Sequence, residues 1–111
     1  MRHRESQLQS ACVKWFRLQY PDRVIFAIPN GGRRGKIEAA IMKGEGVLAG
    51  VADVFVMTSG NGVRGLFIEF KTETGRQSPE QKEFERKCYE WGYAYEIVRS
   101  LDDFKAAIGS V

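Results

Sequence analysis

The sequence contains little of what several protein classes require. It has two cysteines, one histidine and three prolines among 111 residues. Cys12 and Cys88 each lie inside an apolar helical pattern, which predicts two buried thiols in a reducing compartment. His3 cannot complete a structural zinc site with them, because such sites take four nitrogen or sulfur ligands. The sequence therefore predicts a fold held by its own hydrophobic core.

Long hydrophobic runs and linkers are also missing. No run approaches the ~20 apolar residues of a membrane span, and the first residues lack the apolar stretch of a signal peptide, so we expect a cytoplasmic protein without membrane contact. Without repeats, low-complexity tracts or Pro/Ser-rich linkers, we expect one domain spanning residues 1–111. With 43% hydrophobic and 28% charged residues the composition excludes a disordered or fibrous chain, and the net charge of +3 only weakly indicates a polyanionic partner.

Hydrophobic periodicity and capping signals predict an α/β fold. Apolar residues at spacings of three and four indicate helices, whereas short β-branched runs bounded by Gly, Pro and Asn indicate strands. The predicted helices cover residues 5–20, 37–43, 78–91 and 100–108, and the predicted strands cover residues 24–28, 52–58, 64–71 and 93–99. The order α-β-(α)-β-β-α-β-α predicts a mixed β-sheet flanked by helices.

The Gly60-Asn61-Gly62 sequence between two predicted strands indicates a hairpin with a three-residue loop. Such a loop pairs Ser59 with Val63 and, counting outward, pairs Asp53 with Glu69, with Cβ atoms about 4.5–5.5 Å apart. A two-residue loop would shift the register by one and turn Glu69 to the other face. We expect the longer loop, with Gly62 in the left-handed conformation.

A carboxylate pair and a lysine share one face in this register. Strand alternation places Lys71 on the face of Asp53 and Glu69, while the residues between them point into a core. Two adjacent carboxylates with an intervening backbone carbonyl suit Mg²⁺, and an ammonium group beside them can stabilise a phosphoryl transition state and assist a metal-bound water. A solvent-facing cross-strand salt bridge is the alternative.

Two further polar residues begin apolar helix stripes. Glu5 begins the stripe of the first predicted helix, and Gln81 begins the stripe of the third, which ends at Trp91. Both side chains would then point inward, where a shared site of metal and water would satisfy them. Alternatively, Gln81 belongs to a capping box begun by Ser78, and Glu5 lies in a frayed, exposed first turn.

The ordered set of these residues resembles the restriction-endonuclease-like PD-(D/E)xK nuclease superfamily, and more narrowly the VRR-Nuc family. The residues that carry the resemblance are Gly46-Val-Leu-Ala-Gly50-Val-Ala-Asp53, then Glu69-Phe70-Lys71, then Gln81. Asn30-Gly31-Gly32 with the following arginines, and Glu5, are similar to the family pattern, so the resemblance covers nearly the whole chain. The first motif lacks the proline of the superfamily's name.

The resemblance implies a restriction-endonuclease-like fold and a role for each motif residue. Asp53, Glu69 and the backbone carbonyl of Phe70 would bind Mg²⁺, for which Mn²⁺ would substitute. Lys71 would assist the attacking water. No small-molecule cofactor is implied.

The resemblance also implies supporting residues and a biological setting. Glu5 would contact the metal directly or through water, and Gln81 would orient the site. Stand-alone members of this size, from bacteria and phages, are similar to Holliday junction resolvases that act as homodimers on branched DNA. Alternatives are a nuclease on flap or duplex DNA, or a non-catalytic nucleic-acid-binding module.

Basic residues cluster before the predicted site and follow Lys71. They are predicted to contact DNA phosphates, with a solvated surface as the alternative. The predicted nucleic-acid-binding residues are Arg33, Arg34, Lys36, Lys43 and Arg76.

Overall fold

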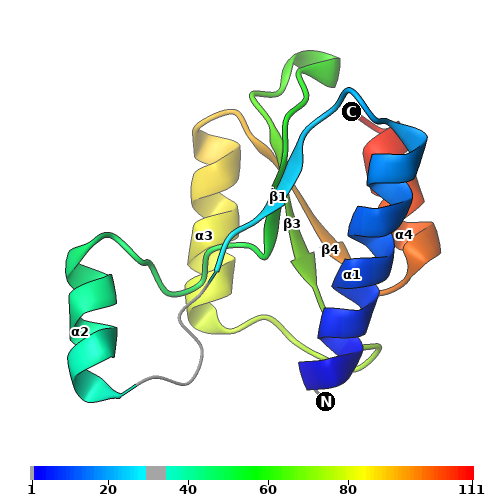
Figure 1. Ribbon diagram of the computed structural model, residues 1–111. Coiled ribbons are helices and arrows are strands. Elements are labelled where there is room, and N and C mark those ends of the chain that lie inside the picture. Colours follow the sequence, from blue (N-terminus) through cyan, green and yellow to red (C-terminus); the bar gives the residue numbers. More distant parts are fainter. Residues whose placement is uncertain (1, 30–34) are drawn as a thin grey trace.

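The fold is a four-stranded β-sheet with helices on both faces (Figure 1). The computed structural model describes residues 2–29 and 35–111. The elements are, in order, α1 (Arg2–Gln19), β1 (Ile25–Ala27), α2 (Lys36–Gly44), β2 (Val54–Val56), the 3-10 turn η1 (Gly60–Gly62), β3 (Leu66–Phe70), α3 (Pro79–Glu90), β4 (Ala94–Val98) and α4 (Leu101–Gly109). The predicted α/β class and element order are confirmed.

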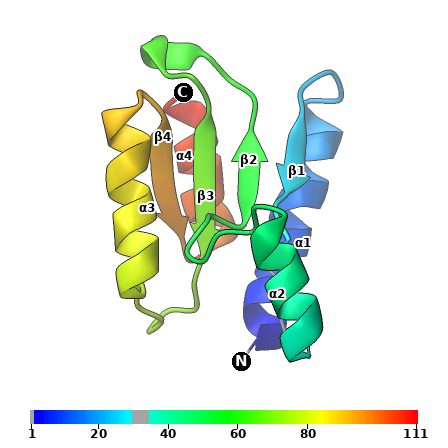
Figure 2. The same ribbon diagram turned by 90° about the vertical axis from the view of Figure 1, so that its left-hand side faces the viewer.

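The sheet is mixed, and β3 lies inside it. Its strand order is β1-β2-β3-β4, with β1, β2 and β3 antiparallel and β4 parallel to β3. The parallel pair requires a crossover connection, which α3 supplies. Figure 2 shows α2 and α3 on one face of the sheet, with α1 and α4 on the other.

The predicted register between β2 and β3 is confirmed, although the predicted hairpin loop is wrong. Val54 lies opposite Ile68 and Val56 opposite Leu66, as the expected pairing requires. The strands are shorter than predicted, however, and residues 57–65 connect them. Because this connection adds residues equally on both sides of the predicted turn, the register is the same.

Long-range contacts explain the conformation of residues 57–65. Instead of pairing with Val63, Ser59 accepts a hydrogen bond from Gly62 N–H through its carbonyl oxygen at 3.2 Å, within η1. Gly62 is left-handed as expected (φ 75°), and Asn61 is left-handed too (φ 58°). The Asn61 side-chain amide donates to the carbonyl of Ser110, so the turn packs against the C-terminal end of α4.

The main core fills the space between the sheet and the α1–α4 layer. Phe16, Phe70 and Phe104 are its largest fully buried side chains. Both cysteines are buried and free, as predicted, and burial raises the pKa of each thiol to about 11. None of the helices within residues 2–29 and 35–111 is long and apolar enough to cross a membrane.

A second, smaller core lies under α3, and Trp91 is not part of it. Buried Ala52, Cys88 and Tyr95 form this core, with Phe84 packed against them. The expected inward position of Trp91 is wrong: α3 ends at Glu90, and the Trp91 side chain is 66% exposed. A residue beyond the last helical turn no longer follows the helix stripe.

Candidate active site

Asp53 and Glu69 lie side by side at one end of the sheet. Asp53 immediately precedes β2, and its Oδ2 accepts a hydrogen bond from Phe70 N–H at 2.7 Å. Glu69 lies in β3 and is only 3% exposed, which makes it the one charged residue classed as buried in the part of the chain that the structure describes. The predicted proximity of the two carboxyl groups therefore follows from the β2–β3 register.

The electrostatics of this pair favour a cation. Burial and, to a smaller extent, the negative charge of Asp53 raise the pKa of Glu69 from its ordinary value of 4.5 to about 8. Burial also raises the pKa of Asp53, against the lowering effect of the hydrogen bond from Phe70 N–H. Ionising both of two adjacent buried carboxyl groups is energetically unfavourable unless a positive charge lies next to them.

The two oxygens of the Glu69 carboxyl group have different partners. Oε2 accepts a hydrogen bond from Gln81 Nε2 at 2.8 Å and lies 3.9 Å from Lys71 Nζ. Oε1 is buried and has no hydrogen-bond partner within the described structure. A hydrogen bond between the Glu69 and Asp53 carboxyl groups requires a proton on one of them, and a ligand that supplies positive charge could take the place of that proton.

The backbone of β3 brings a third oxygen to the same edge. Phe70 N–H points to Asp53, whereas Lys71 N–H donates to the carbonyl of Val98 at 3.0 Å on the opposite edge of the strand. In a β-strand the N–H and C=O of one residue point to the same edge. The Phe70 carbonyl therefore faces the Asp53 side, and three oxygens fit the hard-ligand preference of Mg²⁺.

Gln81 takes part both in the predicted capping box and in a hydrogen bond to Glu69. Ser78 caps α3: its Oγ accepts from Gln81 N–H at 3.1 Å, and its own N–H donates to Gln81 Oε1 at 2.9 Å. This capping box uses only the oxygen of the side-chain amide. The nitrogen is left to donate to Glu69, so the start of α3 fixes the orientation of a carboxylate on β3.

Glu5 lies close enough to Asp53 and Glu69 to affect them electrostatically, but the three side chains do not form a cluster that could hold a metal. Its negative charge raises the pKa of both Asp53 and Glu69. Among residues 2–29 and 35–111, however, no three Asp, Glu, His or Cys side chains come close enough to hold a metal together. Figure 1 shows the start of α1 at the same end of the molecule as the C-terminal end of β3. Glu5 is half-buried there, not fully exposed.

Arg99, which the sequence did not reveal, holds the turn that follows Lys71. Its Nη1 donates to the carbonyl oxygens of Thr72 at 2.7 Å, Gly75 at 2.8 Å and Glu73 at 3.3 Å. The turn passes beside the lysine, since a Cβ built at Gly75 would lie 3.4 Å from Lys71 Cδ. Arg99 thus supports the turn against which the Lys71 side chain rests.

The structure does not gather the predicted basic residues around the carboxylates. Lys36 and Lys43 lie on α2, which buries none of its residues and stands away from the sheet (Figure 1). Arg76 is exposed in the loop before α3. Arg33 and Arg34 lie outside the described residues.

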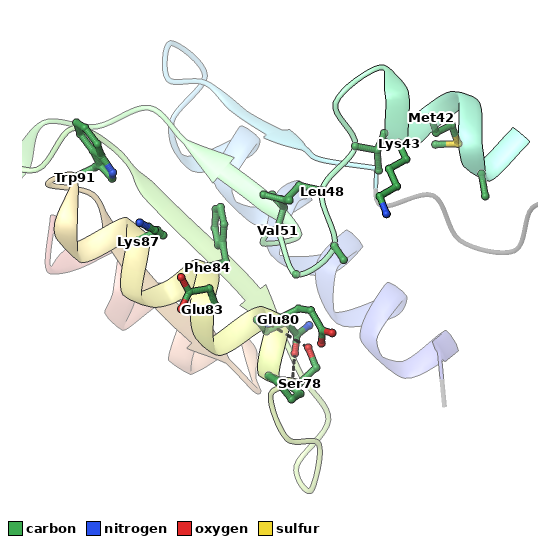
Figure 3. A pocket seen from close by; sticks show the side chains of 16 residues that line it. Met42, Lys43, Leu48, Val51, Ser78, Glu80, Glu83, Phe84, Lys87 and Trp91 are labelled. Atoms are coloured by element: carbon green, nitrogen blue, oxygen red, sulfur yellow. Dashed lines mark hydrogen bonds between the residues drawn. The ribbon is translucent and has the colours of Figure 1, made fainter.

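A groove of about 1270 Å³ adjoins the site between α2, residues 47–51 and α3 (Figure 3). Its lining is mainly apolar, with Leu48, Val51 and Phe84 facing it, and its α3 wall begins at Ser78. Gly50 permits the close approach of the two walls: its φ is 90°, and a Cβ there would lie 2.5 Å from the Glu80 carbonyl group. No periodic signal in the sequence indicates this groove, because its walls come from separate elements.

Comparison with known proteins agrees with this arrangement. The sequence model of the VRR-NUC domain matches residues 2–102. The chain belongs to the VRR-NUC domain family. A solved structure described as a VRR_NUC domain protein is similar to this chain with a TM-score of 0.77 and 24% identity, covering 95% of this chain and 84% of that one. Another, described as a VRR_NUC domain, has a TM-score of 0.63 and 19% identity, covering 96% and 95%.

The predicted family and fold are therefore confirmed. VRR-NUC membership gives the chain a nuclease-type fold, and the structural neighbours share that fold over nearly its whole length. No curated protein matches the chain significantly.

Proposed function

We propose that this VRR-NUC domain is a Mg²⁺-dependent DNA endonuclease that hydrolyses phosphodiester bonds. The observation that carries the proposal is the buried Glu69 Oε1, which has no hydrogen-bond partner in the described structure and lies beside a second carboxyl group. In the metal-free protein a proton on Glu69 offsets the repulsion between the two carboxyl groups, and a divalent cation would take the place of that proton. Mg²⁺ is commonly held by one or two carboxylates and completes its sphere with water and substrate phosphate.

The residues divide the chemistry between them. Asp53, Glu69 and the Phe70 carbonyl would hold the Mg²⁺, or Mn²⁺ in its place, and a bound ion supplies charge stabilisation and a more acidic water. Lys71 Nζ lies 3.9 Å from Glu69 Oε2, where its ammonium can stabilise negative charge on the scissile phosphate and assist deprotonation of the water. Gln81 keeps the Glu69 carboxyl oriented.

Glu5 has an outer role in this proposal. Its half-buried carboxylate influences the pair electrostatically without forming a cluster of three ligands. It would therefore act through a water bound to the metal and not as a direct ligand. The exposed Lys36, Lys43 and Arg76 would contact phosphates further from the cut.

We infer that the substrate is branched DNA and that the protein acts as a Holliday junction resolvase-like homodimer in the cytoplasm of a bacterial or phage-infected cell. The support for a dimer is the apolar face of α2: Ile37 is 78% exposed and Ile41 is 54% exposed. Large apolar side chains exposed on one helix face are typical of an interface. A two-fold dimer would place two sites on two strands of one junction.

Cleavage of matched substrates tests the proposal. A labelled four-way junction, a flap and a linear duplex of the same sequence are incubated with Mg²⁺, Mn²⁺ or EDTA. Paired incisions confined to the junction and lost in EDTA and in Lys71→Ala are the expected result. Lys105→Ala on α4 provides a matched lysine control and should cut normally. Cutting of the flap or duplex instead of the junction would contradict the proposed substrate. Binding without cutting in either metal would indicate a non-catalytic binding module.

A further inference from the structure

A second groove lies between α1 and the outer edge of β1. It has a volume of about 530 Å³ and is lined by seven residues, of which Lys14 and Arg17 are cationic and Gln9 and Ser10 are neutral polar groups. Among the described lining residues none carries a negative charge. The α2–α3 groove differs, because Glu80 and Glu83 line it together with many apolar side chains.

The β1 wall of this groove leads to the carboxylate pair. Ala27 lines the groove and pairs with Val54, the residue after Asp53. The next residue, Ile28, donates its N–H to the carbonyl of Asp53 at 2.8 Å. A chain lying in the groove would therefore pass from α1 along β1 and arrive beside Asp53.

One cation of the groove is held in place. Arg17 Nη2 donates to the carbonyl of Ile25 at 3.1 Å, which ties the guanidinium to the edge of β1. Lys14 lies one helical turn before Arg17 on α1, is exposed, and lines the same groove. Together they place two positive charges along one groove, and Arg and Lys side chains are common phosphate contacts in nucleic-acid-binding proteins.

The length of the groove suits a short stretch of one strand. From Gln9 to Arg17 the helix rises by about 12 Å at 1.5 Å per residue. A stacked nucleic-acid strand advances by about 3.4 Å per nucleotide, so this distance corresponds to three or four nucleotides. Gln9 and Ser10 lie at the end of the groove nearer the start of α1, and hence nearer the site.

The geometry points to a binding site for the sugar-phosphate backbone of the cleaved DNA strand in the α1–β1 groove. The strand would run from this groove to the scissile phosphate past the end of β1, where Ile28 contacts Asp53. Lys14 and Arg17 bind phosphates in the groove, and Gln9 and Ser10 donate hydrogen bonds to the backbone. The inference rests on the proposed nuclease function and adds the path of the strand. It names no base contact, so the groove contributes affinity without sequence preference.

Binding in the absence of cutting tests this path. The probe is a fluorescent single-stranded 12-mer, titrated in EDTA at several salt concentrations with the wild-type protein and with Lys14→Ala, Lys14→Glu and Lys14→Arg. We expect a Kd about 3–10-fold weaker for Lys14→Ala, a larger loss for Lys14→Glu, and near wild-type binding for Lys14→Arg. The salt slope of log K should fall by about 0.7 for the lost phosphate contact. Lys105→Ala, with the same charge change outside the groove, should bind as the wild type does.

Cleavage kinetics and thermal unfolding complete the test. Lys14→Glu should raise KM with kcat nearly unchanged, and its Tm should match that of the wild type, because the side chain is exposed. If Lys14→Glu binds the 12-mer with the affinity and salt slope of the wild type, the proposed DNA-binding role of the groove is wrong. The nuclease proposal survives that result if the wild type still cuts DNA. A wild-type protein that neither binds nor cuts DNA would overturn both.

Discussion

Gln81 donates a hydrogen bond to Glu69 at 2.8 Å while the other end of its amide closes the capping box of α3. One side chain thus links the start of a helix to a buried carboxylate on the central strand. The link has a direction, because the amide presents its oxygen as an acceptor to Ser78 N–H and its nitrogen as a donor to Glu69 at the same time.

Gln81→Glu should separate these two functions. The new carboxylate still accepts from Ser78 N–H, but it loses the donor and places negative charge against Glu69. We expect Mg²⁺-dependent cleavage to fall about 100-fold, within the range that one positioned polar group contributes. Ser78→Ala is the matched control: loss of the N-cap lowers stability by about 1 kcal/mol and leaves most of the activity. Equal activity losses in the two variants would contradict a positioning role for Gln81.

Asp53→Asn should stabilise the metal-free protein while abolishing its response to Mg²⁺. The amide oxygen can still accept from Phe70 N–H, and the repulsion with Glu69 disappears. In EDTA the gain should be about 1 kcal/mol, or roughly 4–8 °C in Tm for a domain near this size. Thermal unfolding with and without 5–10 mM Mg²⁺ measures both effects. A wild-type Mg²⁺ shift that persists in Asp53→Asn would place the ion elsewhere.

The raised pKa of Glu69 predicts how stability depends on pH. Its pKa is about 8 in the folded chain against an ordinary value of 4.5, so between these values the folded state holds a proton that the unfolded state has released. The stability of the metal-free protein should therefore fall as pH rises from about 4.5 to 8. If the proposed Mg²⁺ site is correct, the ion binds the ionised carboxyl groups and should stabilise the protein more at pH 8 than at pH 5. Unfolding in EDTA across this range, with Glu69→Gln as the variant that flattens the profile, measures the effect.

Arg99→Ala should lower the rate of cleavage more than the affinity for DNA. The guanidinium donates hydrogen bonds to three carbonyls of the turn beside Lys71, so we expect its loss to free the side chain that is proposed to be catalytic. We expect kcat to drop about 10-fold, a typical loss for small misplacement of a catalytic group, with Kd in EDTA within two-fold. Arg99→Lys should recover part of the rate. If kcat is unchanged while Tm falls, Arg99 supports only the fold.

Charges on the apolar face of α2 should test the dimer. Ile37→Glu and Ile41→Glu replace exposed side chains, so the monomer should fold with nearly unchanged Tm. Sedimentation at micromolar concentration should show a dimer for the wild type and a monomer for the double variant, with loss of paired incision. Glu38→Lys, an exposed charge change on the same helix, serves as the control. A wild-type protein that sediments as a monomer would remove the basis for this assembly.

The sequence predicted the parts of the site that depend on alternation along a strand. Asp53 and Glu69 lie on the same face because of the register between β2 and β3. This register does not change when the connection between the strands gains the same number of residues on both sides. The loop conformation could not be predicted, because Asn61 bonds Ser110, far along the chain. The two interactions of Gln81 differ in the same way. The capping box could be predicted from the local sequence, whereas the contact with Glu69 depends on how α3 packs against the sheet.

Other features had no local signal at all. Arg99 reaches back across more than twenty residues to the turn after Lys71, and no spacing rule connects them. The α1–β1 groove is lined by residues of α1 and by Ala27 of β1, and the hydrogen bond from Arg17 to Ile25 connects these two elements across an intervening turn. Such contacts depend on tertiary packing, which periodicity and propensity do not encode.

The parallel pairing of β3 with β4 has a consequence for when the chain can work. A ribosome-bound or truncated polypeptide that ends before Ala94 already contains every motif residue from Glu5 to Gln81, yet it lacks the strand whose Val98 carbonyl holds Lys71 N–H. It also lacks Arg99. Because β3 gains its second neighbouring strand only when β4 is synthesised, a shorter chain carries these motif residues on an incomplete sheet. The Lys71 backbone can be held in this position only after residue 98 has been synthesised.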